Sequence, residues 1–442
     1  MVTKLELESV KSYREELVSS KLKPIEILYN LLQGGIFSSY VMYEKDGEVR
    51  IAGNELAKVS VSKTEVCLEG MGKFSSQPAT DPFKQVEQLL ALLPLENWTA
   101  YGYVAFDMAS FYSSYSKAIA QPLLYFFIPE TELLITDEGV RIKSVKPLTQ
   151  IRDLLSTASQ LPDYTPISID EDVADRQNYS HRIEQVRTAI QQNKLHKAIV
   201  SRSRKITGNL DVLGTYAVGA EANNSARSYC FDLGDVKAVG FSPEILMQVD
   251  KQGFVVTNPL AATRPRGESQ AEDRRLHDEL FTDAKEVKEH ALSIWLAQDE
   301  LNSVCVPETV QIFDFMEVKK YRCVQHLSSR AGGQLMPEKT LWDALRVLFP
   351  GITVSGIKKQ KALAWIDRVE EEPRGIYAGG IGWVDSKGTA DIAIAIRSVY
   401  QYDQEIYLNA GAGIVAESVL LKEYIESVNK MNTMLTTLVL QA

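Results

Sequence analysis

The spacing of hydrophobic positions changes several times along the chain and predicts alternating strands and helices. Apolar residues over 40–51 flank Asp46-Gly47, a pair typical of a tight turn between antiparallel strands. Residues 82–93 carry apolar side chains at helical spacing, and residues 101–106 are rich in aromatic and β-branched side chains. The N-terminal part therefore mixes a hairpin, a helix and further strands.

The second part of the chain gives longer elements. Residues 162–177 are polar, acidic and interrupted by proline, which is typical of a linker or of a segment that crosses the surface of one fold. Residues 197–202 alternate as in a strand, and 391–399 form an apolar strand-like run. A helix is predicted from Ala271 to Leu301.

Composition and charge exclude several classes of partner. The 442 residues are 45% hydrophobic and 24% charged, and the formal net charge is −10. This balance argues against nucleic acid or an anionic membrane surface as the main partner. The four cysteines are far apart, the first residues are charged, and no run of about 18 apolar residues occurs. We expect a reduced, cytoplasmic protein without a signal peptide or a membrane span.

Two pairs of glutamates stand at helical spacing in separate segments. Glu423 and Glu426 precede Lys430, and Glu286 and Glu289 lie far upstream. Residues three or four positions apart share one helical face. Paired carboxylates suit a hard divalent cation, and a lysine one turn further suits an anionic substrate. Solvated helix faces are the alternative interpretation.

Four further residues are candidates for acid–base chemistry or for anion binding. Lys197 lies in a strand, where it is either an edge residue or, if neutral, a base. Glu244 follows Pro243 and is either a general acid or an ordinary strand glutamate. Arg397 stands in an apolar run, where a buried guanidinium requires an anionic partner. His326 alone is more typical of a structural histidine.

The order of seven short segments makes the sequence similar to a known family. These segments are Lys197–Arg202, Gly240–Glu244, Pro259–Gly267, Lys285–His290, Gln325–Leu327, Arg374–Tyr377 and Gly411–Ala416. Together they resemble the chorismate-binding enzymes, which include anthranilate, aminodeoxychorismate, isochorismate and salicylate synthases. The resemblance extends over about residues 175–435 and, more loosely, to Tyr101-Gly102-Tyr103.

The resemblance implies an α+β fold with four layers, α/β/β/α, in which two antiparallel sheets pack together. One unit would then span residues 1–442. Residues 1–165 would complete the sheets, and residues 175–436 would form the chorismate-binding core.

The resemblance also implies an activity. Members of the family that add ammonia typically carry glutamine where this chain has Lys197, whereas members that add water keep lysine. Lys197 thus indicates attack by water and no glutamine amidotransferase subunit. Residues 349–357 resemble the salicylate synthases of siderophore pathways. The implied enzyme is a Mg²⁺-dependent monomer or homodimer that converts chorismate through isochorismate to salicylate and pyruvate. An isochorismate synthase that stops after the first step, and a non-catalytic chorismate-binding relative, stay open.

Site roles follow from the same resemblance. The catalytic residues would be Lys197 as base, Glu244 as acid and His326 beside the pyruvyl group. Glu289 and Glu426 would bind Mg²⁺ directly, with Glu286 and Glu423 near it. Substrate would be bound by Ala262, Thr263, Thr353, Tyr377, Arg397, Gly411, Gly413 and Lys430.

Three segments depart from the family pattern. Ala262 replaces a usual glycine, Lys358 replaces a usual proline, and residues 417–420 replace an acidic and proline-containing turn. None of these positions is a proposed acid, base or metal ligand, so we expect activity to be retained.

Overall fold

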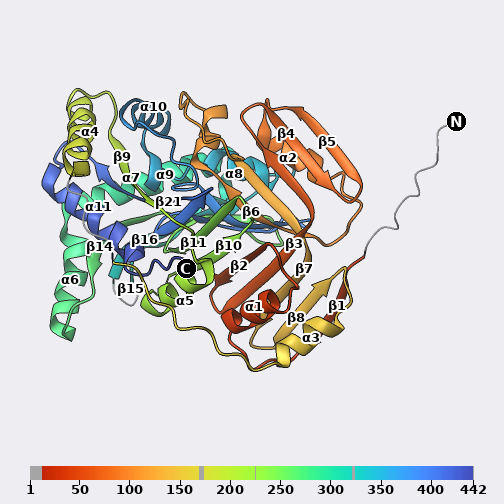
Figure 1. Ribbon diagram of the computed structural model, residues 1–442. Coiled ribbons are helices and arrows are strands. Elements are labelled where there is room, and N and C mark those ends of the chain that lie inside the picture. Colours follow the sequence, from red (N-terminus) through yellow and green to blue (C-terminus); the bar gives the residue numbers. More distant parts are fainter. Residues whose placement is uncertain (1–11, 169–173, 224, 321–323, 442) are drawn as a thin grey trace.

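Two long strands connect the two halves of the sheet structure. The computed structural model describes residues 12–168, 174–223, 225–320 and 324–441 (Figure 1). Strand β3 (Glu48–Val61) pairs along its length with β7 (Leu124–Thr136), with a shift of register between Glu55 and Ala57. On each side of this shift the two strands have different outer neighbours, so two sheets diverge from one ribbon.

The first sheet contains the strand that begins at Lys197. All its ladders are antiparallel, in the order β1-β8-β7-β3-β2-β10-β11-β20-β21-β9-β17. Its further strands are β1 (Arg14–Val18), β2 (Tyr40–Lys45), β8 (Gly139–Ser144), β9 (Lys197–Thr207), β10 (Arg227–Asp232), β11 (Val236–Ser242), β17 (Gly356–Ile357), β20 (Ser398–Tyr402) and β21 (Glu405–Ile414).

The second sheet runs in the order β5-β4-β3-β7-β6-β18-β19-β12-β13-β16. Strand β16 also pairs with β14 and β15. The strands not yet defined are β4 (Glu65–Gly70), β5 (Lys73–Pro78), β6 (Thr99–Val104), β12 (Ile245–Val249), β13 (Phe254–Asn258), β14 (Leu260–Pro265), β15 (Gln311–Lys320), β16 (Val324–Gln334), β18 (Gly380–Asp385) and β19 (Ala390–Ile394).

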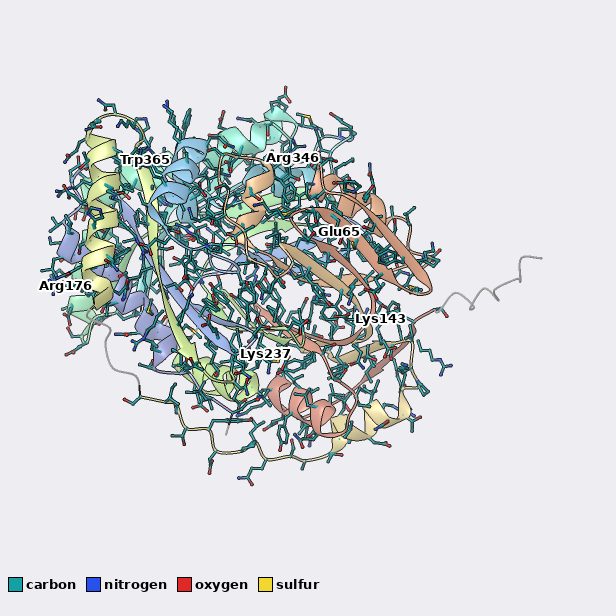
Figure 2. The ribbon with its side chains drawn as sticks, turned by 45° about the horizontal axis from the view of Figure 1, so that its top comes forward. Glu65, Lys143, Arg176, Lys237, Arg346 and Trp365 are labelled. Carbon is teal, nitrogen blue, oxygen red and sulfur yellow. The ribbon has the colours of Figure 1, made fainter. Side chains whose placement is uncertain are left out.

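Side chains from the two sheets pack against each other. The ring of Tyr103 on β6 stacks on Phe231 of β10, with centroids 6.1 Å apart. Asp391 on β19 accepts hydrogen bonds from Tyr43 (2.6 Å) and Arg227 (2.7 Å) of the first sheet. Because a buried carboxylate is costly unless it is paired, this network fixes how the sheets face each other. Figure 2 shows the side chains that fill the space between the ribbons.

Helices cover the strands from both sides of the molecule (Figure 1). One apolar cluster joins the first sheet to α1 (Pro24–Gln33), α3 (Thr149–Ser156), α5 (Val212–Ala222) and α11 (Leu420–Leu435). Strand β9 is covered by α4 (Ala174–Gln191) and α10 (Lys359–Val369). Against the second sheet lie α2 (Pro82–Leu90), α6 (Gln270–Thr282), α7 (Ala284–Asn302) and α8 (Leu341–Leu348).

Short helical turns complete the chain: η1 (Phe106–Phe111), η2 (Pro307–Thr309) and α9 (Ile352–Ser355). The predicted α+β class with antiparallel sheets is confirmed. The division into four layers and the domain boundaries stay predictions. Within the described segments, no helix is long and apolar enough to span a membrane.

Two elements that were predicted to be continuous are interrupted in the structure. The expected helix from Ala271 to Leu301 is two helices, because Asp283 interrupts it and accepts a hydrogen bond from Glu286 N–H (3.3 Å) at the start of α7. The expected strand over 391–399 is also divided. Arg397 lies between β19 and β20 with φ of 49°, a left-handed turn conformation rather than a strand. By contrast, Asp46-Gly47 forms the predicted β2–β3 turn.

Candidate active site

One cavity of about 680 Å³ gathers most of the predicted site residues. It is bounded by β9, β21, α7, α9 and α11, and by the connection between β11 and β12. Thirteen predicted residues line it: Lys197, Glu244, Glu286, Glu289, His326, Thr353, Tyr377, Arg397, Gly411, Gly413, Glu423, Glu426 and Lys430. Ala262 and Thr263 belong to β14, but their side chains lie outside the described residues.

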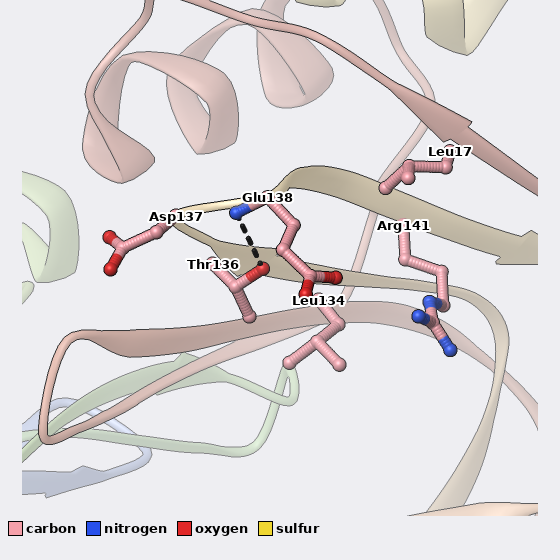
Figure 3. A pocket seen from close by; sticks show the side chains of 6 residues that line it. All are labelled: Leu17, Leu134, Thr136, Asp137, Glu138 and Arg141. Atoms are coloured by element: carbon pink, nitrogen blue, oxygen red, sulfur yellow. Dashed lines mark hydrogen bonds between the residues drawn. The ribbon is translucent and has the colours of Figure 1, made fainter.

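A second hollow, at the β7–β8 turn, has a different character (Figure 3). It measures about 370 Å³ and is lined by Leu17, Leu134, Thr136, Asp137, Glu138 and Arg141. Its charged side chains are exposed, and the Glu138 N–H donates to Thr136 Oγ1 at 3.3 Å. Exposed charges at a hairpin turn are typical of a solvated surface.

Glu244 is buried at the junction of β11 and β12. Pro243 ends the ladder there, and the carboxyl turns into the cavity with 4% of the residue exposed. Its Oε1 accepts from Thr353 Oγ1 at 2.6 Å and from the Leu260 N–H at 3.2 Å. Burial outweighs these hydrogen bonds and the attraction of Lys197 and Lys430, and raises the pKa of Glu244 to about 7. A carboxyl with this pKa can hold and release a proton near neutral pH.

Lys197 begins β9 and points into the same cavity. Its Nζ donates to Glu289 Oε2 at 2.8 Å, and each of the two side chains is 13% exposed. A base role would require this nitrogen to turn from Glu289 toward the attacking water and to act as a neutral amine.

Gly413 on β21 leaves the space that the lysine occupies. A Cβ built there would lie 2.8 Å from Lys197 Cε and 3.4 Å from its Nζ. If Lys197 is the base, we expect Gly413→Ala to reduce kcat about 10-fold to 100-fold, because the displaced amine would lose alignment with the substrate. The flexible lysine end can move aside, so the melting temperature should change little. Steady-state kinetics and thermal unfolding of this variant test the expectation, and an unchanged kcat would contradict it.

The two glutamate pairs reach the cavity from different helices. Glu286 and Glu289 come from α7, and Glu423 and Glu426 come from α11. Lys430 Nζ donates to Glu426 Oε1 at 2.6 Å and to the carbonyl of Gly411 at 3.0 Å. In the described part of the chain, no three acidic, histidine or cysteine side chains are grouped as a formed metal site. The donor set nevertheless fits Mg²⁺, because hard carboxylate oxygens from two helices face one cavity.

The same cavity also carries groups suited to a carboxylate. Burial raises the pKa of Tyr377 to about 12, so its phenol stays a hydrogen-bond donor at neutral pH. Tyr377 Oη would lie 3.1 Å from a Cβ built on Gly411, so glycine keeps the approach open. Arg397 and the buried His326 line the same cavity, and His326 is in register with Thr263 of β14.

Several lining residues were not predicted as site residues. They include Ile199, Arg264, Asn409, Lys422, Asn429 and Thr433. Helical spacing from Glu426 could have identified Asn429 and Thr433, and strand alternation from Lys197 could have identified Ile199. Strand alternation from Gly411 could likewise have identified Asn409, whereas Arg264 lies in the Pro259–Gly267 segment but reaches this cavity only through the tertiary fold.

Comparison with known proteins agrees with this geometry. Residues 39–436 match the chorismate binding enzyme family. Salicylate synthase of Mycolicibacterium paratuberculosis is 31% identical over 402 residues, covering 89% of this chain and 88% of that protein. Anthranilate synthase component 1 2 of Haloarcula marismortui is 38% identical over 288 residues, covering 63% of this chain and 54% of that protein.

A solved structure is also similar to this chain over most of its length. The crystal structure of anthranilate synthase component I from Streptococcus pneumoniae TIGR4 superposes with a TM-score of 0.76 at 27% identity, covering 89% of this chain and 92% of that one. The extent of the match and the similarity of the salicylate synthase show that this chain belongs to the chorismate-binding enzymes.

Proposed function

We propose that this enzyme is a Mg²⁺-dependent salicylate synthase, which converts chorismate through isochorismate to salicylate and pyruvate for siderophore biosynthesis. The observation that carries the proposal is that Lys197 and the buried Glu244, whose pKa is raised to about 7, line the same cavity. The similarity to a salicylate synthase over most of both chains supports it.

The first step is a displacement of hydroxyl by water on the ring. Lys197, once neutral and released from Glu289, accepts a proton from the attacking water. Glu244 donates its proton to the departing hydroxyl, which leaves as water. One water enters and one leaves, so the step isomerises chorismate to isochorismate.

The second step needs no side-chain acid or base. The C–O bond to the pyruvyl group breaks while a ring hydrogen passes to the pyruvyl methylene carbon, which gives pyruvate and an aromatic ring. Tyr377 and Arg397 would hold the pyruvyl carboxylate during this step, with His326 beside it. The contribution of the enzyme is then to orient the pyruvyl group of the substrate over the ring.

The ring carboxylate would lie at the acidic end of the cavity. Glu286, Glu289, Glu423 and Glu426 are the side chains that would hold Mg²⁺ there. When bound, the ion offsets the charge of the ring carboxylate and fixes its position. Backbone groups of Ala262, Thr263, Gly411 and Gly413 would complete this end, Thr353 would hold Glu244, and Lys430 would add positive charge.

Two other activities within the family are alternatives. An isochorismate synthase would carry out the first step alone. The side chains of the cavity do not distinguish it from a salicylate synthase, because the second step uses no side chain as acid or base. An anthranilate synthase is suggested by the similarity to the Haloarcula marismortui protein. Lys197 argues against it, since a base is required for water but not for ammonia. A non-catalytic chorismate-binding protein would not need the acid and base to be present together.

Product identification distinguishes these possibilities. The protein is incubated with chorismate and Mg²⁺, with and without ammonium, and the products are separated by chromatography. We expect salicylate and pyruvate in equal amounts, and loss of both when a chelator is added. Isochorismate alone would establish the shorter reaction, and anthranilate formed with ammonium would overturn the assignment to water attack. Binding of chorismate without turnover would favour the non-catalytic alternative.

A further inference from the structure

A buried ion pair outside the cavity joins the elements that carry the acid and the base. Glu370 follows the C-terminus of α10, and Arg374 lies four residues further along the chain. Arg374 Nε donates to Glu370 Oε2 at 2.8 Å, and Nη2 donates to Oε1 at 2.6 Å. The side chains are 5% and 1% exposed, and neither lines the cavity. Burying two charges is costly unless further hydrogen bonds stabilise them. The other hydrogen bonds of Glu370 and Arg374 therefore indicate what the ion pair holds in place.

The first set of bonds goes to the strand of Lys197. Strand β21 pairs with residues 198–207 of β9, whereas β17 pairs only with Lys197 and Ala198. Beyond β17, the Ser201 N–H donates to Glu370 Oε1 at 2.7 Å. The carbonyl of Ile199 accepts from Arg374 Nη2 at 2.6 Å. The ion pair thus takes the place of a neighbouring strand immediately after Lys197.

The second set of bonds goes to the helix beside Glu244. Arg374 Nη1 donates to the carbonyl of Val354 in α9 at 2.7 Å. The preceding residue, Thr353, donates its hydroxyl to Glu244 Oε1 at 2.6 Å. One guanidinium therefore bonds both to the strand that carries the base and to the helix that holds the acid.

The backbone of Arg374 is itself fixed. Its N–H donates to Asp107 Oδ1 at 3.2 Å, and its carbonyl accepts from Tyr400 Oη at 2.8 Å. Arg374 is 1% exposed, so its planar group has little freedom to rearrange. A rigid group that bonds to two elements sets the distance between them.

We propose that Arg374 is a positioning residue, which aligns Lys197 with Glu244 through the carbonyls of Ile199 and Val354 without touching the substrate. The inference rests on the proposed function, in which these two side chains are base and acid. Lysine at this position would keep the charge but could not make four hydrogen bonds in the geometry of a guanidinium.

The test compares Arg374→Lys with Arg227→Lys. Arg227 is a matched control, because it is 2% exposed, bonds to Asp391 through Nε (2.7 Å) and Nη2 (2.9 Å), and lies between the sheets away from the cavity. We expect both variants to be destabilised. Arg374→Lys should lower kcat about 10-fold to 100-fold with KM changed less than about two-fold, and Arg227→Lys should retain kcat.

Amide hydrogen exchange gives a readout that does not depend on turnover. Residues 197–201 and 352–355 should exchange faster in Arg374→Lys than in Arg227→Lys. If wild-type protein does not turn over chorismate, the proposed function fails, and exchange alone decides the positioning role. Wild-type exchange at both segments, or an equal loss of kcat in the two variants, overturns the inference. If Arg374→Lys does not fold, Glu370→Gln, which keeps an acceptor for Ser201 N–H, is judged by the same measurements.

Discussion

Replacing Glu244 by glutamine is expected to lower the turnover of chorismate by about 10²-fold to 10⁴-fold, the usual contribution of a general acid. Glutamine can accept the hydrogen bonds from Thr353 and Leu260 N–H that the carboxyl accepts. The cavity should therefore keep its shape while losing the proton that leaves with the hydroxyl. The measurement is kcat for consumption of chorismate at pH 7, and a loss of less than about five-fold would remove Glu244 from the role of acid.

The stability of the same variant relative to the wild type should increase with pH. The pKa of Glu244 is raised from 4.5 to about 7 in the folded protein, mainly by burial. The unfolded chain thus releases this proton first, and the free energy of unfolding decreases as pH rises from about 4.5 to about 7. The difference corresponds to about 3 kcal/mol above pH 7. Glutamine does not titrate, so the stability of Glu244→Gln relative to wild type should rise by about this amount between pH 4 and pH 8.

Denaturant unfolding at the two pH values measures this change. A stability difference that is the same at pH 4 and pH 8 would contradict a raised pKa, whatever the effect on turnover. The two readouts are therefore independent. Loss of activity tests whether the Glu244 proton takes part in the reaction. The pH dependence of stability tests whether burial raises the pKa of Glu244.

Local patterns predicted the elements that carry the site, and their limits have physical causes. Asp46-Gly47 identified a hairpin because few residues adopt positive φ readily, and both do so here. The spacing of Glu423 and Glu426 placed both on one face of α11 correctly. These features depend on neighbouring residues, and the sequence displays them directly.

The arrangement of the cavity depends on contacts between distant residues and could not be derived from periodicity. Lys197 and Glu289 are 92 residues apart in the chain, and their ion pair is formed only when β9 and α7 meet. Arg397 has a left-handed backbone conformation, which the apolar, strand-like sequence around it did not indicate. Arg374 belongs to a segment that carries the family resemblance, but the role proposed for it depends on its bonds to the carbonyls of Val354 and Ile199. Only the resemblance to a family placed such residues together in advance.

Replacing Lys197 by glutamine is expected to remove the addition of water and to lower kcat by about 10²-fold to 10⁴-fold. The amide cannot take a proton from water, but it leaves an uncharged polar group with N–H donors on the side of the cavity that faces Glu289. The variant should therefore fold, with the free energy of unfolding changed by about 1 kcal/mol. Product analysis at saturating chorismate and Mg²⁺, together with thermal unfolding, gives both quantities.

Lys430→Gln is the matched control for this variant. Lys430 also pairs with a cavity glutamate, Glu426, but its proposed contribution is positive charge for substrate binding. We expect this control mainly to raise KM, whereas Lys197→Gln should mainly lower kcat. If Lys197→Gln retains salicylate synthesis while Lys430→Gln loses it, the base is not Lys197. The proton would then have to be taken by another group of the cavity, and Lys197 would no longer distinguish attack by water from attack by ammonia.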